Sequence, residues 1–580
     1  MLRKPRGNIY RRLSVFFERK CRSNVSYVRT MSTEKSKLSS QSPPTSCPNL
    51  QYKDDLFNFT RGRFVVDEEF EMSQRHVNFN VYELARLAAE AVGASQCVSI
   101  EKYPDGMYNK AMLLTMDNGT QVVAKIPNPN AGQPQFTTAS EVATMDFVRN
   151  VLKTPVPKVF AWSSKAKENP VGAEYIIMEK VPGIELERVW PTMKTEDRLT
   201  VVQTIAKYQK SWTSVSFKKY GSLYYTTDID TDSDNEALYT DADGTAVKNS
   251  TFSIGPSTGR ELIDERRMTV EFDRGPWQTI EEYHVAIGNR EIAAVKQLPK
   301  LPKSPITLYG PGTYIPTRER KLKALQCYLR LIRFLIPPDP MITSSHLWHD
   351  DLHVANIFVN PSKPTEITGL IDWQSTELSP LYFHARQPHL IDYDGPQYVG
   401  RERPKLPDGF NSLDEDEQKR AKTLFLQQSL CALYNTITYR KNTRLHTALE
   451  FQQTMNYTLL LLPRNMVVDG EASYLSQVAA LEETWDTVSG QRGLPYPFSF
   501  SSEQRKEMEA HTEGALVGMR AMRSIQEAVG DLFPEQGCVR TECYDEARDA
   551  LDQMKEQVIE EFAKSEEERE LWNLWWPFGT

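Results

Sequence analysis

The sequence predicts an α+β fold with two lobes, a small N-terminal lobe built on an antiparallel sheet and a large, mostly helical C-terminal lobe. Three observations support this. Strand patterns separated by tight turns fill residues 98–126, helical patterns dominate after residue 414, and a polar loop with a strand pair lies between them at residues 346–373. The chain has 580 residues, which is too long for one compact core and favours two lobes.

A lysine lies on the third strand of the predicted N-terminal sheet. Alternation in Gln121-Val-Val-Ala-Lys125 places Lys125 on the same face as Val123. A lysine there needs a carboxylate partner or a phosphate, because an unpaired buried ammonium is costly. The three strands are expected at residues 98–103, 107–116 and 120–126.

Glu141 is the natural partner of this lysine. Residues 138–152 read as a helix, and Glu141 leads its apolar stripe. An alternative needs no lysine, because Thr138-x-x-Glu141 is also a capping box. We expect the ion pair, since the strand lysine otherwise lacks a partner.

The polar loop contains the residues that phosphoryl transfer requires. Asp351 precedes Asn356 by five residues, and Asp372 ends the next apolar run. Phosphoryl transfer from a nucleotide needs one group that orients a hydroxyl and two that hold Mg²⁺ against the phosphates. The sequence therefore predicts Asp351 as the acceptor-orienting base, and Asn356 and Asp372 as the metal ligands.

A hairpin would bring the two metal ligands together. Residues 356–360 and 366–372 read as strands joined by a turn. If Asn360 pairs with Glu366, Asp372 becomes a diagonal neighbour of Asn356, roughly 7–8 Å away. Oxygen ligands at that spacing could share one cation.

Zinc is the alternative for the same stretch. His346, His349 and His353 place three imidazoles within eight residues. Zinc ligands usually have helical or hairpin spacing and an ordered second shell. Because this segment reads as an extended loop, we expect its histidines to bond the backbone instead.

The remaining sequence is expected to be scaffold. Residues 226–250 are acidic and read as a solvated insertion. The aromatic tail Leu571-Trp-Asn-Leu-Trp-Trp-Pro-Phe578 is expected to dock on the chain's own surface, with a partner interface as the alternative. Helices are expected at residues 414–438, 443–462, 473–488, 501–530 and 541–573.

Composition narrows the class of protein. Residues 1–30 carry nine Lys or Arg and one acid, Glu18, which is typical of a mitochondrial transit peptide; a basic tail for nucleic acid or anionic lipid is the alternative. The whole chain has a net charge of −8, so the rest is acidic, which argues against nucleic acid as a partner. No apolar run reaches transmembrane length, and the seven cysteines lack CxxC spacing.

The lysine strand, the glutamate helix and the loop resemble the protein-kinase-like fold in its small-molecule branch, the aminoglycoside phosphotransferases and choline kinases. Their loop reads approximately His-Gly-Asp-Leu-His-Pro-Gly-Asn, matched here by His349-Asp-Asp-Leu-His-Val-Ala-Asn356. This resemblance implies ATP and Mg²⁺ as cofactors and a small-molecule substrate. Asp350 stands where the pattern has glycine, and this extra carboxylate could raise the pKa of Asp350 or Asp351.

The resemblance also assigns the nucleotide-binding backbone. The backbone at Glu179 and Val181 would meet the adenine base, although a plain core strand and turn reads as well. The turn at Gly106 would lie above the phosphates; its lone glycine is equally consistent with a simple hairpin turn.

More specific motifs narrow the resemblance to the fungal altered inheritance of mitochondria protein 9 family. These are the basic N-terminal segment, Asp105-Gly-Met-Tyr-Asn-Lys110, Ile254-Gly-Pro256, Arg274-Gly-Pro-Trp277 and the His-Asp-Asp-Leu-His loop. The family implies a mitochondrial address. The expected organisation is a transit peptide at residues 1–30, a linker at 31–49, an N-lobe at 50–182 and a C-lobe at 183–580.

We expect an ATP-dependent phosphotransferase that acts on a small hydroxyl-bearing molecule. The alternative is a catalytically weak, kinase-like nucleotide-binding or scaffold protein in mitochondria. Transfer to a protein is a third possibility, although no Ala-Pro-Glu follows Asp372 at the usual distance, which argues against a conventional protein kinase.

Overall fold

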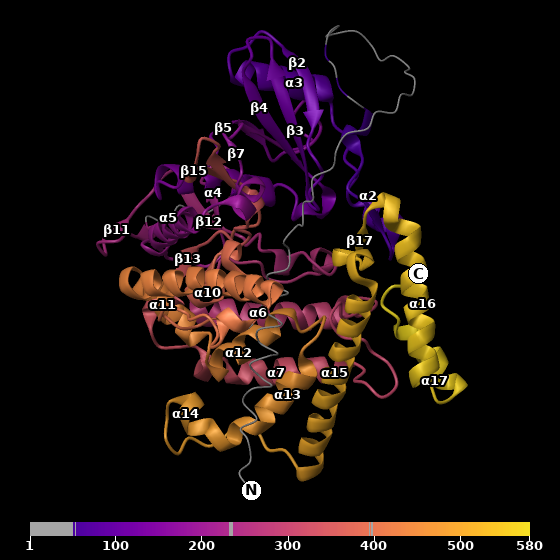
Figure 1. The fold of residues 1–580 in the computed structure, drawn as a ribbon. Helices are drawn as coiled ribbons and strands as arrows, with labels where there is room; N and C mark the ends of the chain where they lie inside the picture. Colours follow the sequence, from indigo (N-terminus) through magenta and orange to yellow (C-terminus); the bar gives the residue numbers. More distant parts are fainter. Residues whose placement is uncertain are drawn as a thin grey trace.

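The computed structural model describes residues 50–579 apart from residues 51, 53, 231–235, 394, 396 and 397. The predicted transit peptide and linker therefore lie outside the described residues. A small lobe that contains the first sheet stands above a larger helical lobe, and the C-terminal helices run along one side of the molecule (Figure 1).

The N-terminal lobe is a five-stranded antiparallel sheet in the order β2-β3-β4-β6-β5. Helix α3 (Val81–Ala91) covers one face, over the buried side chains of Val122, Ala124 and Ile126. Because side chains alternate along a strand, Val123 and Lys125 turn to the other face, which borders the cleft. The strands are β2 (Cys97–Lys102), β3 (Asn109–Met116), β4 (Gln121–Pro127), β5 (Val159–Ser163) and β6 (Tyr175–Glu179).

Helix α4 (Phe136–Asn150) follows β4 and is held from both lobes. Strands β5 and β6 of the N-terminal lobe contact it, and so does β9 (Ser222–Tyr225) of the C-terminal lobe. Its Phe147 ring packs against three aromatic rings of the C-terminal lobe, those of Phe217, Tyr239 and Phe252. Tyr239 is buried, so the prediction that residues 226–250 form a solvated insertion is wrong at this residue.

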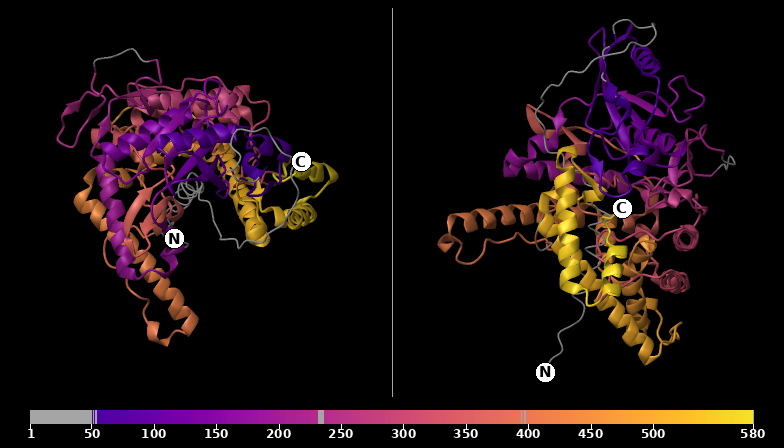
Figure 2. Two further views of the ribbon diagram at one scale, coloured as in Figure 1. Left: turned by 90° about the horizontal axis from the view of Figure 1, so that it is seen from above. Right: turned by 90° about the vertical axis from the view of Figure 1, so that its right-hand side faces the viewer.

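The C-terminal lobe is mostly helical, and α10 projects from its body (Figure 2). Its longer helices are α5 (Thr195–Thr213), α6 (Ile280–Gln297), α7 (Arg318–Leu335), α10 (Glu415–Lys441), α11 (Thr443–Phe451), α12 (Met455–Leu461), α13 (Glu471–Ala480), α15 (Ser502–Val529), α16 (Tyr544–Phe562) and α17 (Glu566–Trp575). Its short helices are α8 (Pro340–Thr343), α9 (Leu381–His384) and α14 (Trp485–Ser489).

Three helices that the sequence predicts as continuous are divided in the structure. Residues 443–462 form α11 and α12, residues 473–488 fall on α13 and α14, and residues 541–573 form α16 and α17. Two of the breaks have a local cause. The side chains of Thr454 and Ser565 accept hydrogen bonds from the backbone N–H groups of Tyr457 and Glu568, and such capping starts a new helix.

Several small sheets accompany the helices. One contains β15-β14-β7 in that order, and another contains β11-β10-β8-β13-β16. The strand β12 (Phe252–Gly255) pairs with β9. The remaining bounds are β7 (Ile184–Glu185), β8 (Ser216–Phe217), β10 (Tyr239–Thr240), β11 (Ala246–Val247), β13 (Ser345–Leu347), β14 (Ile357–Asn360), β15 (Lys363–Leu370) and β16 (Leu378–Pro380).

The C-terminal helices are tied to the start of the described chain. Strand β1 (Arg63–Phe64) pairs antiparallel with β17 (Cys538–Val539), just before the short helix α2 (Glu68–Ser73). The aromatic tail docks on the chain itself, as predicted: Trp572 and Trp576 are buried, and the Trp576 carbonyl accepts a hydrogen bond from Lys303.

These features confirm the predicted fold class. An antiparallel sheet with one long helix after its third strand, set above a helical lobe, is the protein-kinase-like arrangement. None of the helices in the described part has both the length and the apolar character that a bilayer crossing demands.

Candidate active site

Lys125 joins the two lobes at the centre of the cleft. Its Nζ lies 2.6 Å from Glu141 Oε1 and 2.9 Å from Asp372 Oδ1. The predicted ion pair with Glu141 is therefore present. The capping-box alternative is wrong, because α4 begins at Phe136 and Thr138 lies inside the helix.

The charges around Lys125 explain its protonation state. Burial alone would lower the pKa of this lysine, but the carboxylates of Asp372 and Glu141 raise it above its ordinary value. Burial would likewise raise the pKa of Asp372, and the lysine charge lowers it below the usual range. Both groups are thus held in their charged forms. The link between Lys125 and Asp372 was not predicted from the sequence.

The Asp351 loop is fixed by hydrogen bonds to its histidines. His349 Nε2 lies 2.8 Å from the Ile371 carbonyl, and its Nδ1 accepts from the Asp351 N–H at 3.3 Å. His353 Nδ1 accepts from the Ala355 N–H, which leaves Nε2 as the N–H, 3.5 Å from Asp351 Oδ2. These two histidines bond the backbone, as expected for a loop. His346, in contrast, lies on a strand at residues 345–347, and its Nε2 is 3.4 Å from Ser344 Oγ.

The hairpin after this loop has a different register from the predicted one. Ile357 lies opposite Leu370, and Asn360 pairs with Lys363, not with Glu366. Two irregularities in β14 and β15 absorb the difference, and periodicity alone does not reveal such bulges. The Ile371 N–H donates to the Asn356 carbonyl at 3.0 Å, so the residue directly before Asp372 is bonded to Asn356.

Asn356 and Asp372 offer oxygen donors to this part of the cleft. The Asn356 amide nitrogen donates to the Asp351 carbonyl at 2.9 Å, which leaves Oδ1 as the side-chain oxygen for a cation. Asp372 lies two residues after the end of β15 and has φ +66°, a left-handed conformation. Both side chains line the cleft, together with Asp351.

The predicted nucleotide-binding backbone also borders the cleft. Glu179, Val181 and Gly106 all line it. The Glu179 N–H donates to the Lys158 carbonyl at 2.8 Å. The Gly106 N–H donates to the Asn109 carbonyl at 3.2 Å, which closes the turn before β3.

Asp350 has a structural role that the sequence did not reveal. Its Oδ1 lies 2.6 Å from Arg386 Nη2 and 3.3 Å from His384 Nδ1. Burial alone would raise the pKa of Asp350, but the charges of His384 and Arg386 lower it well below its ordinary value. The expectation that two adjacent carboxylates raise a pKa here is therefore wrong for Asp350, because these two groups neutralise it.

Sequence reasoning also missed contacts between the glycine turn and the C-terminal lobe. Asn109 exchanges two hydrogen bonds with Gln374, at 2.8 and 3.0 Å. The Arg260 guanidinium lies 3.8 Å from the centre of the Tyr108 ring. Local patterns carry no signal for pairs so distant in sequence, although Gln374 stands only two residues after Asp372.

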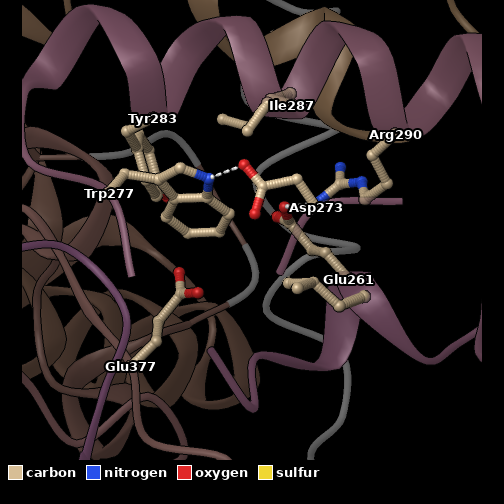
Figure 3. A pocket seen from close by; sticks show the side chains of 9 residues that line it. Glu261, Asp273, Trp277, Tyr283, Ile287, Arg290 and Glu377 are labelled. Carbon is tan, nitrogen blue, oxygen red and sulfur yellow. Dashed lines mark hydrogen bonds and ion pairs between the residues drawn. The ribbon is translucent and has the colours of Figure 1, made fainter. Parts of the chain in front are cut away.

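A small recess lies under α6 (Figure 3). Trp277 of the Arg-Gly-Pro-Trp motif donates to Asp273 Oδ2 at 2.7 Å. Glu377 and Glu261 border both the recess and the cleft, and both pair with Arg464, at 3.3 and 2.6 Å. This motif therefore supports the wall of the cleft and brings no group of its own to Asp351.

Comparison with known proteins decides the family. The subtelomeric hrmA-associated cluster protein of Aspergillus fumigatus is 31% identical to this chain over 451 residues, which cover 72% of this chain and 85% of that protein. The Altered inheritance of mitochondria protein 9 of Yarrowia lipolytica is 25% identical over 399 residues, which cover 65% of this chain and 67% of that protein. The chain therefore belongs to the same family as the Aspergillus fumigatus protein, and homologues named Altered inheritance of mitochondria protein 9 confirm the predicted resemblance.

The relatives and a family model bear on the predicted localisation and on the general class of the protein. Several homologues of this chain are named as mitochondrial proteins, in agreement with the predicted mitochondrial address. The phosphotransferase enzyme family model matches residues 312–383, a range that contains Asp351, Asn356 and Asp372. The chain is thus a phosphotransferase-like protein.

A solved structure is also similar to this chain. It is the GDP complex of an aminoglycoside 2′-phosphotransferase, with 12% sequence identity and a TM-score of 0.31, covering 75% of this chain and 98% of that one.

Proposed function

We propose that this protein is an ATP-dependent phosphotransferase that acts on a small hydroxyl-bearing molecule. One observation carries the proposal. Lys125 bonds Glu141 and Asp372 at once, in a cleft that Asp351 and Asn356 also line. A phosphate-binding cation, two oxygen ligands and a hydroxyl-orienting carboxylate are the groups that phosphoryl transfer uses.

Lys125 and the glycine turn would bind the phosphates. Glu141 holds the lysine on the cleft face of the sheet, where its ammonium could bind the α- and β-phosphates. The turn at Gly106 would cover the phosphates, and the backbone at Glu179 and Val181 would bind the adenine.

The donor set fits magnesium. Asp372 supplies a carboxylate whose pKa is lowered, so it stays ionised at neutral pH, and Asn356 supplies an amide oxygen. Mg²⁺ prefers hard oxygen ligands and is usually held by one or two protein groups together with substrate phosphates. When bound, the ion would neutralise charge on the phosphates. Lys125 would then exchange part of its contact with Asp372 for the nucleotide.

Asp351 would orient the acceptor hydroxyl. Its backbone N–H is bonded to His349 and its carbonyl to Asn356, so the residue is held at both ends while about a third of its side chain (34%) remains exposed. Phosphoryl transfer has a loose transition state, so the carboxylate takes the hydroxyl proton late. Positioning and charge neutralisation then supply most of the rate enhancement.

The Asp351→Asn variant tests this function. Purified protein and variant are incubated with Mg·ATP and a panel of hydroxylated metabolites, and ADP is measured. We expect one acceptor class to support turnover that the variant loses by roughly 10²–10⁴-fold, the usual contribution of a general base.

Two results would contradict the proposal. ADP formation no greater than that of the variant for every acceptor would favour the catalytically weak nucleotide-binding alternative. Label from ATP that appears on macromolecules of a mitochondrial extract, and not on small molecules, would show that the acceptor is a protein.

A further inference from the structure

We propose that Asn109 and Gln374 form a latch, a hydrogen-bonded pair that joins the two lobes. The latch couples the turn at Gly106 (the glycine turn) to the segment that carries Asp372 (the metal-binding loop). In this role they are positioning residues that act through Asp372 and the turn. The inference rests on the proposed function, because it assigns them to the binding of Mg·nucleotide at that same site.

The latch is a reciprocal amide pair. Asn109 Nδ2 donates to Gln374 Oε1 at 2.8 Å, and Gln374 Nε2 donates to Asn109 Oδ1 at 3.0 Å. Each amide uses one donor and one acceptor on the other, so the geometry is specific to this pair. The two residues are 265 positions apart, and both side chains are partly buried, which shields the bonds from competing water.

The two residues stand beside the functional loops. Asn109 begins β3, and its carbonyl accepts the hydrogen bond from Gly106 that closes the turn. Gln374 lies between Asp372 and Ser375, both of which have positive φ, +66° and +57°. Non-glycine residues keep such conformations only where their surroundings hold them. The amide pair is one contact able to do so from the opposite lobe.

Other contacts prepare the turn for this role without reaching the metal-binding loop. Asp105 is buried and accepts hydrogen bonds from Thr60 and Lys102 on the outer side of the turn. Arg260 stacks on Tyr108, and Asn130 Nδ2 donates to the Met107 carbonyl at 3.2 Å. These hold the turn in place, whereas Asn109 ties it to the segment that carries Asp372.

The latch has a defined consequence for nucleotide binding. With both hydrogen bonds formed, the turn and Asp372 approach the phosphates as one unit, and the lobes must break the bonds to release product. Two net hydrogen bonds correspond to a roughly 5- to 150-fold effect on affinity. Neutral bonds of that strength can open and close within a catalytic cycle.

The test compares five proteins. They are the wild-type protein, Asn109→Ala, Gln374→Ala, the double alanine variant and the exchange variant N109Q/Q374N. The exchange variant keeps the same total side-chain length across the pair, so it should restore the contact. Asn130→Ala is the matched control, because it removes an amide that holds the same turn without touching Gln374. The Kd for Mg·ATP and the hydrogen exchange of the ligand-free protein are measured.

We expect each single alanine variant to weaken Mg·ATP binding by roughly 5- to 150-fold. The double variant should be no weaker than the weaker single variant, and the exchange variant should recover most of the affinity. In ligand-free protein, Asn109→Ala should speed exchange at the distant Ile371 amide, whereas Asn130→Ala should affect only the turn around Gly106. Single effects that multiply in the double variant, or affinities within twofold of wild type, would overturn the latch.

The amide hydrogen-exchange measurement separates this inference from the proposed function. If the wild-type protein does not bind Mg·ATP, the proposed function fails. The latch is then judged on amide hydrogen exchange alone. Faster exchange at Ile371 in Asn109→Ala would then still support the latch. Unchanged exchange there would overturn it, whatever the result with nucleotide.

Discussion

Lys125 shows at the scale of one residue how the fold creates a site. A buried ammonium is unfavourable unless it is paired, and the cleft supplies one carboxylate from each lobe, Glu141 and Asp372. Residue type and strand periodicity could predict the Glu141 pair. They could not predict that Asp372 completes it, or that Arg386 and His384 neutralise Asp350, because those partners depend on how the chain folds back.

Buried histidine gives a prediction at the same scale. His284 lies between the hydroxyls of Tyr328 and Tyr382, at 2.9 and 2.6 Å from its ring nitrogens. The Tyr328 hydroxyl also donates to the His284 carbonyl, so the Tyr328 oxygen accepts from the Nδ1–H of His284. Nε2 then accepts from the Tyr382 hydroxyl, as in a neutral imidazole. Burial, with the nearby charge of Arg464, lowers the pKa of His284 to about 3.

The sign of the pH effect follows. The unfolded chain binds a proton at His284 near pH 6.5, whereas the folded protein does not until about pH 3. Stability therefore falls as pH drops below about 6.5, by up to about 1.4 kcal/mol per pH unit for this group. Urea unfolding at pH 7.5 and 5.5 should show a smaller pH dependence for His284→Gln, because the glutamine side chain does not titrate. An equal pH dependence in the two proteins would contradict this assignment.

At the scale of elements, the strands and helices of the site follow from local patterns. The sequence places the β4 strand and helix α4 within two residues of their observed bounds, since alternation and an apolar stripe are local signals. The hairpin that carries Asn356 was predicted with the wrong register. Bulges and capping depend on hydrogen bonds of single residues, which periodicity does not encode.

Gly183 gives a prediction for the close approach between the chain just before β7 and strand β14. Gly183 has φ +108°, and a Cβ there would meet the Val359 carbonyl of β14 well inside contact distance. Gly172 is the matched control, because it has φ +73° with open space around it. Alanine at 172 should cost about 1–2 kcal/mol of conformational energy. Alanine at 183 should cost about 3 kcal/mol or more, since overpacking adds to strain.

Urea unfolding of the two glycine variants measures this difference. Equal losses of unfolding free energy would show that β14 moves away from Gly183 without cost. The close approach would then not be what keeps β7 packed against β14.

At the scale of the whole molecule, the two lobes are joined in several places besides the chain segment between β6 and β7. The C-terminal lobe packs on α4 through Phe217 and Phe252, strand β1 pairs with β17, and Asn109 bonds Gln374. Such contacts join residues far apart in the sequence, so no local pattern predicts them. Together these contacts restrict the movement of helix α4, which carries Glu141. We therefore expect any closure of the cleft to occur at the turn around Gly106.

The central claim is that Asp372 binds Mg²⁺ beside the nucleotide, and it can be tested on the whole protein. The measurement is the thermal stabilisation by ATP with and without Mg²⁺, which rises with ligand affinity. Asp372→Asn removes the carboxylate but tolerates the left-handed backbone, and Asp350→Asn is the matched control, because Asp350 is already paired with Arg386.

The account predicts that Mg²⁺ increases the stabilisation by ATP in the wild-type protein and in Asp350→Asn, and that Asp372→Asn loses this increase. A magnesium effect of the same size in Asp372→Asn as in the wild-type protein would contradict it.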